Sequence, residues 1–316
     1  MTSGERDIYT ISDPPFMNSL TVFTYNAEEF LREVSKKGTS SDIEFHERKS
    51  DDSILTFISP LRYPDKISSL TDSIFAADIA VVNITSLNRD LGEVIVALDL
   101  MGPDRGFITF TDSNIIDQVR PLLKGTRLSS YEITEKQPVE LSDQISSMKT
   151  KKPESPTTVV IDHFFGVKSV GTVALGFVLS GTVHKHQDLE LSYLDRKVQV
   201  RSIQMHDVDV DSASPGARVG LALKNVDPEE LERGMLLSEK QFEYASVIEA
   251  KIAPHRSVKR IPDGQVEVFV SDYMRYQRGF YDGKTLTMDK KVCLPGKSLV
   301  VSSPAVVPRI FGRINF

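Results

Sequence analysis

The pattern of hydrophobic and polar positions changes near residue 155 of this 316-residue chain. Before that point, short apolar runs alternate with stretches of helical spacing. The runs predict strands at 20–25, 54–58, 78–84, 106–111 and 128–133, and the spacing predicts helices at 27–37, 92–101 and 115–123, the first ending at Gly38. The run DIAVVNI at 78–84 is almost continuously apolar, as in a strand buried within a parallel sheet. Residues 1–155 are therefore expected to form an α/β domain with a mostly parallel sheet.

A polar stretch with two prolines at residues 149–157 marks the first expected domain boundary. After it, strands follow one another without helices, which predicts antiparallel β-barrels. A second boundary is expected near residue 240, because the strands beyond it are separated by Pro, Gly and Asp turns. These strands are predicted at 246–252, 265–270, 284–288 and 298–302. The expected domains are 1–155, 156–240 and 241–316.

The composition is that of a soluble globular protein, with 40% hydrophobic and 26% charged residues. The single cysteine, Cys293, excludes an internal disulfide and argues against a cysteine-rich zinc site. The amino terminus is acidic and broken by prolines, and no stretch has the apolar length of a membrane span. We therefore expect a cytoplasmic protein with no cofactor, no metal site and no membrane or DNA partner.

The net charge of −6 hides an asymmetry between the two ends of the chain. Residues 1–155 hold 25 acidic against 17 basic side chains, whereas residues 241–316 hold 7 against 12. A basic segment on an acidic protein points weakly to phosphate-bearing partners, and ordinary surface charge is an equally good reading of this number.

Five short sequence motifs between residues 159 and 237 carry a family resemblance. They are VGTV at 170–173, GTV at 181–183, RSIQ at 201–204, RVGLAL at 218–223 and ERGMLL at 232–237. In this order they resemble the second domain of translational GTPases of the elongation factor Tu type. Because such a barrel normally follows a GTP-hydrolysing domain, the resemblance implies a GTPase-like, P-loop-type fold for residues 1–155, followed by two antiparallel β-barrels.

The expected GTPase-like domain lacks three nucleotide motifs. A phosphate-binding loop needs glycines whose backbone N–H groups surround the phosphates, yet no glycine lies between Gly4 and Gly38. The DxxG motif is replaced by SPLR at 59–62, and the guanine-reading NKxD motif by TDSN at 111–114. We therefore predict a degenerate GTPase domain and a protein that is not an enzyme, with residual nucleotide binding left open.

The chain also resembles a group of archaeal elongation-factor-like paralogues related to the selenocysteine-specific factor. The segments KKGTSSDI at 36–43 and RSIQMHDVDV at 201–210 carry this likeness. In that group the nucleotide-binding loops are also degenerate.

The resemblance further implies a pocket for the aminoacylated end of tRNA in the second domain. Carried over by position, the pocket residues are Asp162, His163, Gln204, His206 and Arg218. Gln204 and His206 alternate on one predicted strand, so both are expected to face the same ligand. His206 is expected to stack on a base, and Arg218 to pair with a terminal phosphate or to hold Asp162.

Two segments of the third domain are candidates for contact with the RNA backbone. HRSVKR at 255–260 is a compact basic cluster, and YMRYQRGFY at 273–281 mixes arginines with aromatic residues. The residues expected to contact RNA phosphates are Arg256, Lys259, Arg260, Arg275 and Arg278.

Three functions follow from these observations. The favoured one is an elongation-factor-like protein whose barrels bind aminoacyl-tRNA, the ribosome or both, and whose GTPase-fold domain does not hydrolyse GTP. The alternatives are a GTPase with an unconventional site and a protein-interaction module that partners an active elongation factor.

Overall fold

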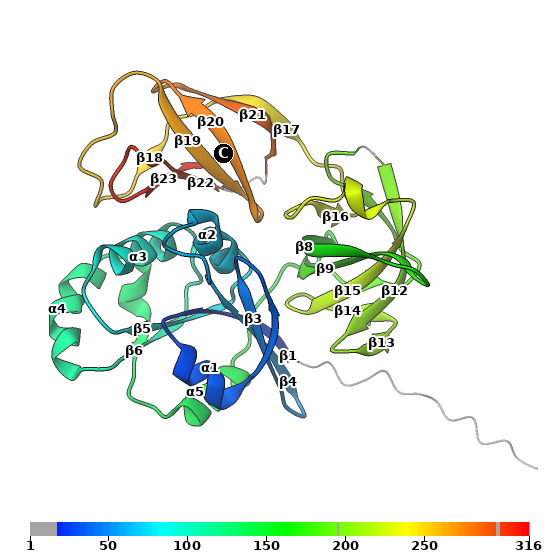
Figure 1. Ribbon diagram of the computed structural model, residues 1–316, viewed down its shortest axis with the longest axis horizontal. Helices are drawn as coiled ribbons and strands as arrows, with labels where there is room; N and C mark the ends of the chain where they lie inside the picture. The colour runs from blue at the N-terminus through cyan, green and yellow to red at the C-terminus, as the bar shows by residue number, and fades with distance from the viewer. Residues whose placement is uncertain (1–17, 195, 295–297, 316) are drawn as a thin grey trace, which may run out of the picture.

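A computed structural model describes residues 18–194, 196–294 and 298–315. The described residues form three sheet-based bodies that meet at a common centre (Figure 1). The first is a mixed sheet covered by helices, and the other two consist almost entirely of strands. Among these described segments, no helix has the length and apolarity needed to cross a membrane.

The first domain contains a seven-stranded sheet with the order β2-β3-β4-β1-β5-β6-β7. Its strands are β1 (Asn18–Tyr25), β2 (Lys36–Ser40), β3 (Glu44–Lys49), β4 (Ser53–Ser59), β5 (Ile79–Ile84), β6 (Gly106–Phe110) and β7 (Glu132–Ile133). Strands β4, β1, β5, β6 and β7 are parallel neighbours, and β2 and β3 add an antiparallel edge. The prediction of a mostly parallel sheet is confirmed.

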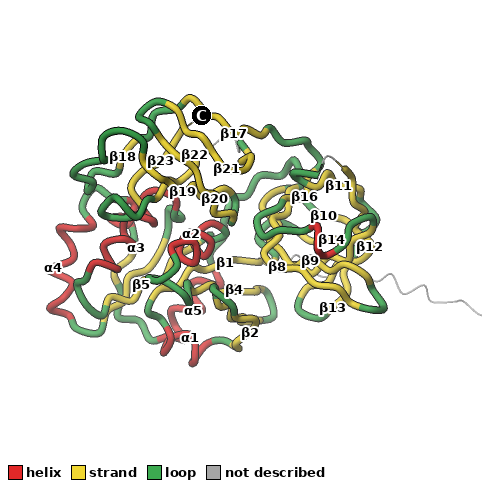
Figure 2. Tube along the Cα trace, turned by 45° about the horizontal axis from the view of Figure 1, so that its top comes forward, coloured by secondary structure: helices red, strands yellow, loops and turns green. Residues whose placement is uncertain are grey.

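Helices cover both faces of this sheet (Figure 2). They are α1 (Glu28–Val34), α2 (Ile67–Phe75), α3 (Arg89–Met101), α4 (Ser113–Leu123) and α5 (Pro138–Ser147), with a short 3-10 helix at Arg127–Ser130. Leu31 of α1 and Ile145 of α5 pack on one face, whereas Leu70 of α2 and Val94 of α3 pack on the other. These apolar stripes explain why the chain folds into three layers.

Two local predictions in this domain are wrong. The helix expected at 27–37 ends at Val34, and Gly38 lies inside strand β2 instead of capping a helix. The backbone is already extended at Ser35, and a side chain at Gly38 would press on the carbonyl oxygen of Phe45 in β3. The first half of the strand expected at 128–133 belongs to the 3-10 helix, and only Glu132 and Ile133 form a strand, β7.

The second domain is a closed antiparallel barrel, as predicted. Its strands are β8 (Thr158–Val167), β9 (Gly171–Ser180), β10 (Val183–His184), β11 (Asp188–Leu191), β12 (Arg196–Met205), β13 (Val208–Val210), β14 (Ser212–Ala213), β15 (Arg218–Lys224) and β16 (Leu236–Ser238), with a 3-10 turn at Pro228–Glu230. The order β11-β16-β8-β9-β15-β12-β13 closes through pairing of β11 with β12. Alternate residues such as Val198 and Val200 fill its core.

The third domain is a second β-sheet body with the order β17-β21-β20-β19-β22-β23-β18. Its strands are β17 (Tyr244–Glu249), β18 (Ala253–Pro254), β19 (Val266–Asp272), β20 (Arg275–Tyr281), β21 (Thr285–Cys293), β22 (Ser298–Ser302) and β23 (Ile310–Asn315). Val268, Leu286 and Phe311 are fully buried in its core.

One apolar cluster is shared by all three domains. It joins Phe45 and Ile58 of the first domain, Phe177 and Leu236 of the second, and Met274 of the third. Each of these side chains is buried. The domains are therefore held together by a common core rather than by loose surface contacts.

Candidate functional site

The carboxyl end of strand β1 is where a parallel sheet of this kind would place a phosphate-binding loop. Here β1 leads into Asn26, whose φ is +51°, and then directly into α1. Ala27 at the helix start offers no side-chain cap, and Glu28 and Glu29 occupy the first turn. Their carboxylates suit the helix dipole but oppose a triphosphate at the same position.

Residues at the end of β4 and just after β6 also form hydrogen bonds within the protein. The hydroxyl oxygens of Thr24 and Ser59 lie 2.6 Å apart, which links the ends of β1 and β4. After β6, Oδ1 of Asp112 accepts hydrogen bonds from both the backbone N–H and the side-chain amide of Asn114, each at 2.9 Å. The only carboxylate of this loop therefore caps helix α4.

A cavity of about 460 Å³ lies at this edge of the sheet, between α1, β3 and the end of β4. Tyr25 and Tyr63 line it, and their rings meet edge to face with centroids 6.2 Å apart. Glu44 and His46 lie on its β3 side. Arg32 and Lys37 add two cations to this lining, so the cavity carries charges of both signs.

Asp162 and Arg218 of the predicted tRNA pocket do come together. Nε of Arg218 lies 3.0 Å from Oδ2 of Asp162, and the Asp162 side chain is fully buried. The guanidinium also lies 4.0 Å from the ring centroid of Phe45 in the first domain. The expectation that Arg218 holds Asp162 is confirmed, and the pair also joins the barrel to the first domain.

His206 occupies a different position from the one expected. It does not alternate with Gln204 on a strand, because β12 ends at Met205 and His206 lies in the following turn with φ +50°. Its Nδ1 is 2.8 Å from Oε2 of Glu47 on β3, and only 11% of its side chain is exposed. The hydrogen bond from His206 lowers the pKa of Glu47. His206 is thus another contact between the first two domains.

The remaining two pocket residues lie on the surface. Gln204 donates a hydrogen bond to Asp209 on the neighbouring strand β13. His163 is exposed on β8, and its ring lies 6.1 Å from that of Phe165, which is 41% exposed. Among the described residues, neither Gln204 nor His163 makes a hydrogen bond or ion pair with Asp162 or Arg218. A shared tRNA-end pocket stays a prediction.

Of the five residues expected to contact RNA, one is buried, one contacts the first domain and three are exposed on the third domain. Arg275 is only 6% exposed, lies 2.7 Å from Glu232 and stacks over the Tyr193 ring at 3.9 Å, so its prediction as a surface RNA contact is wrong. Arg256 donates to the backbone oxygen of Lys124 in the first domain. Arg260 pairs with a neighbouring carboxylate, Arg278 pairs with two, and Lys259 is exposed.

Helix α2 is held at the junction of all three domains. Every residue from Ser68 to Ile74 is buried, and the helix packs against β19 and β20 of the third domain. Nη1 of Arg233, from the second domain, lies 2.8 Å from Asp42 and 3.4 Å from Asp72 on α2. Nζ of Lys66 lies 2.6 Å from Asp42. We call Arg233, Asp42 and Asp72 the α2 clamp.

The two carboxylates of the α2 clamp differ in their proton affinity. Burial raises the pKa of Asp72 to about 8, although the Arg233 charge opposes the rise. Burial acts in the same direction on Asp42, but hydrogen bonds from Arg233 and Lys66 outweigh it and hold the pKa of Asp42 well below its usual range. The clamp therefore behaves as a coupled site with one carboxylate ionised near neutral pH.

The third domain docks on helix α3 through two further charged contacts. Glu93 is completely buried, and its carboxylate accepts from Arg309 at the backbone N–H (2.9 Å), at Nε (2.9 Å) and at Nη2 (2.7 Å). One turn and a half further along, Asp99 lies 2.9 Å from Nε2 of His255. These contacts join the third domain to the first.

Sequence reasoning missed the residues of these interdomain contacts. Asp72 and Glu93 lie within amphipathic helical stretches, where a carboxylate is ordinarily assigned to the solvent side. The signal available was that apolar residues stand two positions away on both sides of each carboxylate, in ISSLTDSIF at Ile67–Phe75 and in LGEVI at 91–95. Their partners lie 161 and 216 residues away in the chain.

Comparison with known proteins relates this three-domain architecture to a protein family. The family model of elongation factor Tu domain 2 matches residues 171–238. An uncharacterised protein of Methanocaldococcus jannaschii is 37% identical over 238 residues, which span 75% of this chain and 77% of that protein. The selenocysteine-specific elongation factors of Mus musculus and M. jannaschii are 33% and 39% identical over 119 and 100 residues. The chain belongs to the elongation factor Tu and selenocysteine-specific elongation factor family.

The two selenocysteine-specific relatives are matched over only part of their length. The aligned regions cover 37% and 31% of this chain but only 20% and 21% of those proteins. Solved structures of the family share the whole fold. Elongation factor SelB from Methanococcus maripaludis in complex with the GTP analogue GppNHp has a TM-score of 0.78 at 19% identity, covering 96% of this chain and 80% of that one. Bacterial EF-Sec has a TM-score of 0.75 at 18% identity, covering 95% and 58%.

These findings confirm the fold class. A parallel-sheet α/β domain is followed by β-barrel domains in the arrangement of this family. The chain is a translation elongation factor-like protein.

Proposed function

We propose that this protein binds aminoacyl-tRNA, the ribosome or both through its β-barrels, and that its GTPase-fold domain no longer hydrolyses GTP. The observation that carries the proposal is the burial of helix α2 among all three domains. The cytoplasm, where charged tRNA and ribosomes occur, is the expected compartment.

Helix α2 follows β4, the position at which GTPases carry a switch segment. Such segments are ordered by contacts to the γ-phosphate and Mg²⁺ and are released on hydrolysis. In this protein the α2 clamp and the shared apolar cluster already hold the helix in place. A switch that is fixed by protein contacts gains little from a nucleotide, because a ligand shifts an equilibrium only by its differential affinity for two states.

The motif losses support the same conclusion from the sequence. The loops after β1, β4 and β6 lack the glycines, the DxxG aspartate and the guanine-reading carboxylate. Glu28 and Glu29 add negative charge where phosphates would approach. Three independent losses at one edge of the sheet favour a fixed spacer domain over an unconventional GTPase.

The surface left for RNA is smaller than the sequence indicated. Lys259, Arg260 and Arg278 are exposed in the third domain, and His163 and Phe165 form an exposed ring pair on the second. The cations suit phosphate contact, and the rings suit stacking on an unpaired base at a tRNA end. We therefore assign base stacking to His163 and Phe165 instead of His206.

The test is binding of charged and uncharged tRNA in parallel, each with and without GTP·Mg²⁺, over a range of salt concentrations. The proposal predicts salt-sensitive binding of charged tRNA that does not change when nucleotide is added. His163→Ala is expected to weaken binding of charged tRNA by about 1–3 kcal/mol, the usual contribution of one stacking side chain. His184→Ala, an exposed histidine on the same barrel, is the matched control.

The outcomes separate the competing functions. Binding that requires GTP would favour the unconventional GTPase. No tRNA or ribosome binding under any condition, with folded protein, would contradict the proposal and favour a protein-interaction module.

A further inference from the structure

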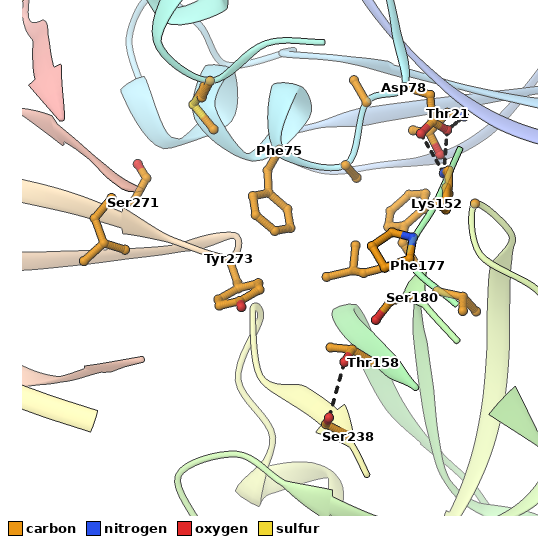
Figure 3. Close-up of a pocket in the computed structure, with 18 of the residues that line it drawn as sticks. Thr21, Phe75, Asp78, Lys152, Thr158, Phe177, Ser180, Ser238, Ser271 and Tyr273 are labelled. Carbon is orange, nitrogen blue, oxygen red and sulfur yellow. Dashed lines mark hydrogen bonds and ion pairs between the residues drawn. The ribbon is translucent and has the colours of Figure 1, made fainter. Parts of the chain in front are cut away.

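A second cavity, of about 830 Å³, lies where the three domains meet (Figure 3). Its wall comes from the amino end of β5, the 149–157 linker, strands β9 and β16, the β19–β20 turn and β23. Thr21 and Asp78 mark its position at the amino edge of the parallel sheet, since Asp78 directly precedes β5. This is the edge opposite to the one where the family's nucleotide loops would lie.

Aromatic rings form much of the wall. Phe75 at the end of α2 and Tyr273 in the β19–β20 turn project toward the hollow, and their ring centroids lie 5.4 Å apart at 64° (Figure 3). Phe177 of β9 lines the side formed by the second domain. The rings of Phe75 and Tyr273 offer flat apolar surface to a ligand, whereas the ring of Phe177 is buried behind the wall. The volume is in the range of small-molecule sites.

The charged groups of the wall leave an excess of positive charge. Nζ of Lys152 is 2.6 Å from Asp78, so these two neutralise each other. Arg127 gives one N–H to Asp104 at 2.6 Å, but its Nε is buried and has no partner. The guanidinium of Arg313 makes no hydrogen bond or ion pair with any residue that the structure describes. Lys240 adds a further positive charge at the mouth.

A buried polar atom without a partner needs an explanation, because most such atoms in folded proteins are satisfied. Two of them belong to residues of this wall: Nε of Arg127 and Oγ1 of Thr21, whose residue is only 1% exposed. One is a cationic donor and the other a neutral hydroxyl. Together with the free Arg313 they match a ligand that carries negative charge at one end.

We infer that this three-domain cavity binds a small organic anion with a planar aromatic group, of the class that includes nucleoside monophosphates and aromatic carboxylates or sulfonates. The rings of Phe75 and Tyr273 hold its planar group, and Arg127 and Arg313 hold its charged group. Among the described residues of the wall, Asp78 is the only carboxylate, and it is paired with Lys152. A magnesium-bound triphosphate therefore has no metal ligand here. A ligand that touches all three domains also stabilises their closed arrangement.

The experiment uses 8-anilinonaphthalene-1-sulfonate as a fluorescent planar anion, added to the whole folded protein and displaced by AMP. Saturable binding is expected, with loss of fluorescence as AMP is added and a smaller effect from inorganic phosphate. Arg313→Gln is expected to weaken binding about tenfold, the effect of one charge-assisted hydrogen bond. Arg313→Lys keeps the charge and is expected to restore most of the affinity.

Arg120→Gln, which removes the same charge from the exposed surface of α4, is the matched control and should bind as the wild type does. A second variant, Arg127→Gln, tests the other cation, and thermal unfolding checks that each variant is folded. Equal binding by the wild type and all variants, or no saturable binding, would overturn the inference and leave the cavity as a water-filled space. Because the readout uses no tRNA, its failure is separate from failure of the proposed function.

Discussion

Removing Arg233 is expected to destabilise the protein strongly, because its guanidinium is the shared partner of two buried carboxylates. The side chains of Asp42 and Asp72 are 12% and 4% exposed, and that of Arg233 is 24% exposed. Each hydrogen bond that involves a charged group contributes about 1.5–3 kcal/mol, and a buried partner left without one costs a similar amount. In the Arg233→Ala variant Lys66 still neutralises Asp42, whereas the buried Asp72 carboxyl, which keeps its proton near neutral pH, loses its hydrogen-bond partner. We therefore expect a loss of about 3 kcal/mol.

Thermal unfolding measures this loss. At roughly 2–4 °C per kcal/mol for a cooperative unit of this size, Arg233→Ala is expected to lower the Tm by about 6–12 °C. Arg260→Ala is the control, because it breaks an ion pair whose side chains are 75% and 86% exposed. Such a pair is worth less than about 1 kcal/mol. Adding Asp72→Asn to Arg233→Ala should recover part of the loss. Equal Tm values for the two arginine variants would refute the argument that the clamp holds α2.

Three further changes test other parts of the account. Because burial raises the pKa of Asp72 to about 8, the folded state keeps a proton that the unfolded state releases near pH 4, so Asp72 destabilises increasingly from pH 4 to 8. The Tm gain of Asp72→Asn over the wild type should therefore grow between pH 5 and pH 8, and a gain that shrinks would contradict the assigned pKa. Glu93→Gln should lower the unfolding free energy by roughly 2–4 kcal/mol, against less than 1 for the exposed Glu267→Gln, as measured by denaturant titration. Changing Lys259, Arg260 and Arg278 to Ala should each reduce the slope of log affinity for tRNA against log salt by about one, and an unchanged slope in the triple variant would exclude this surface.

The parts of the fold that follow local sequence rules were predictable. The continuous apolar run before Ile84 and the alternating positions of the second domain fix which residues face a core, whatever the rest of the chain does. These signals were enough to predict the α/β layers of the first domain and the barrel of the second. They failed at Ser35, where the chain leaves the helix early because strand β2 must reach its partner β3.

The interdomain contacts were not predictable in this way. Arg275 lies in a sequence typical of an RNA-binding surface, yet it is buried because Glu232 and Tyr193 come from the second domain. His206 was expected on a strand because no glycine, the usual residue for a positive φ, stands next to it in the sequence. Such positions depend on how whole domains dock, and a single sequence carries no local signal for that arrangement.

Thermal unfolding with and without GTP·Mg²⁺, GDP·Mg²⁺ and GppNHp·Mg²⁺ tests the central claim most directly, namely that the three domains are closed by protein contacts and no longer by a nucleotide. At about 1 mM ligand, a Kd of about 10 μM would add roughly 2.7 kcal/mol to the unfolding free energy. The account predicts the same Tm with every nucleotide as without any. A rise of several degrees with GTP or GppNHp, larger than with GDP, would contradict it.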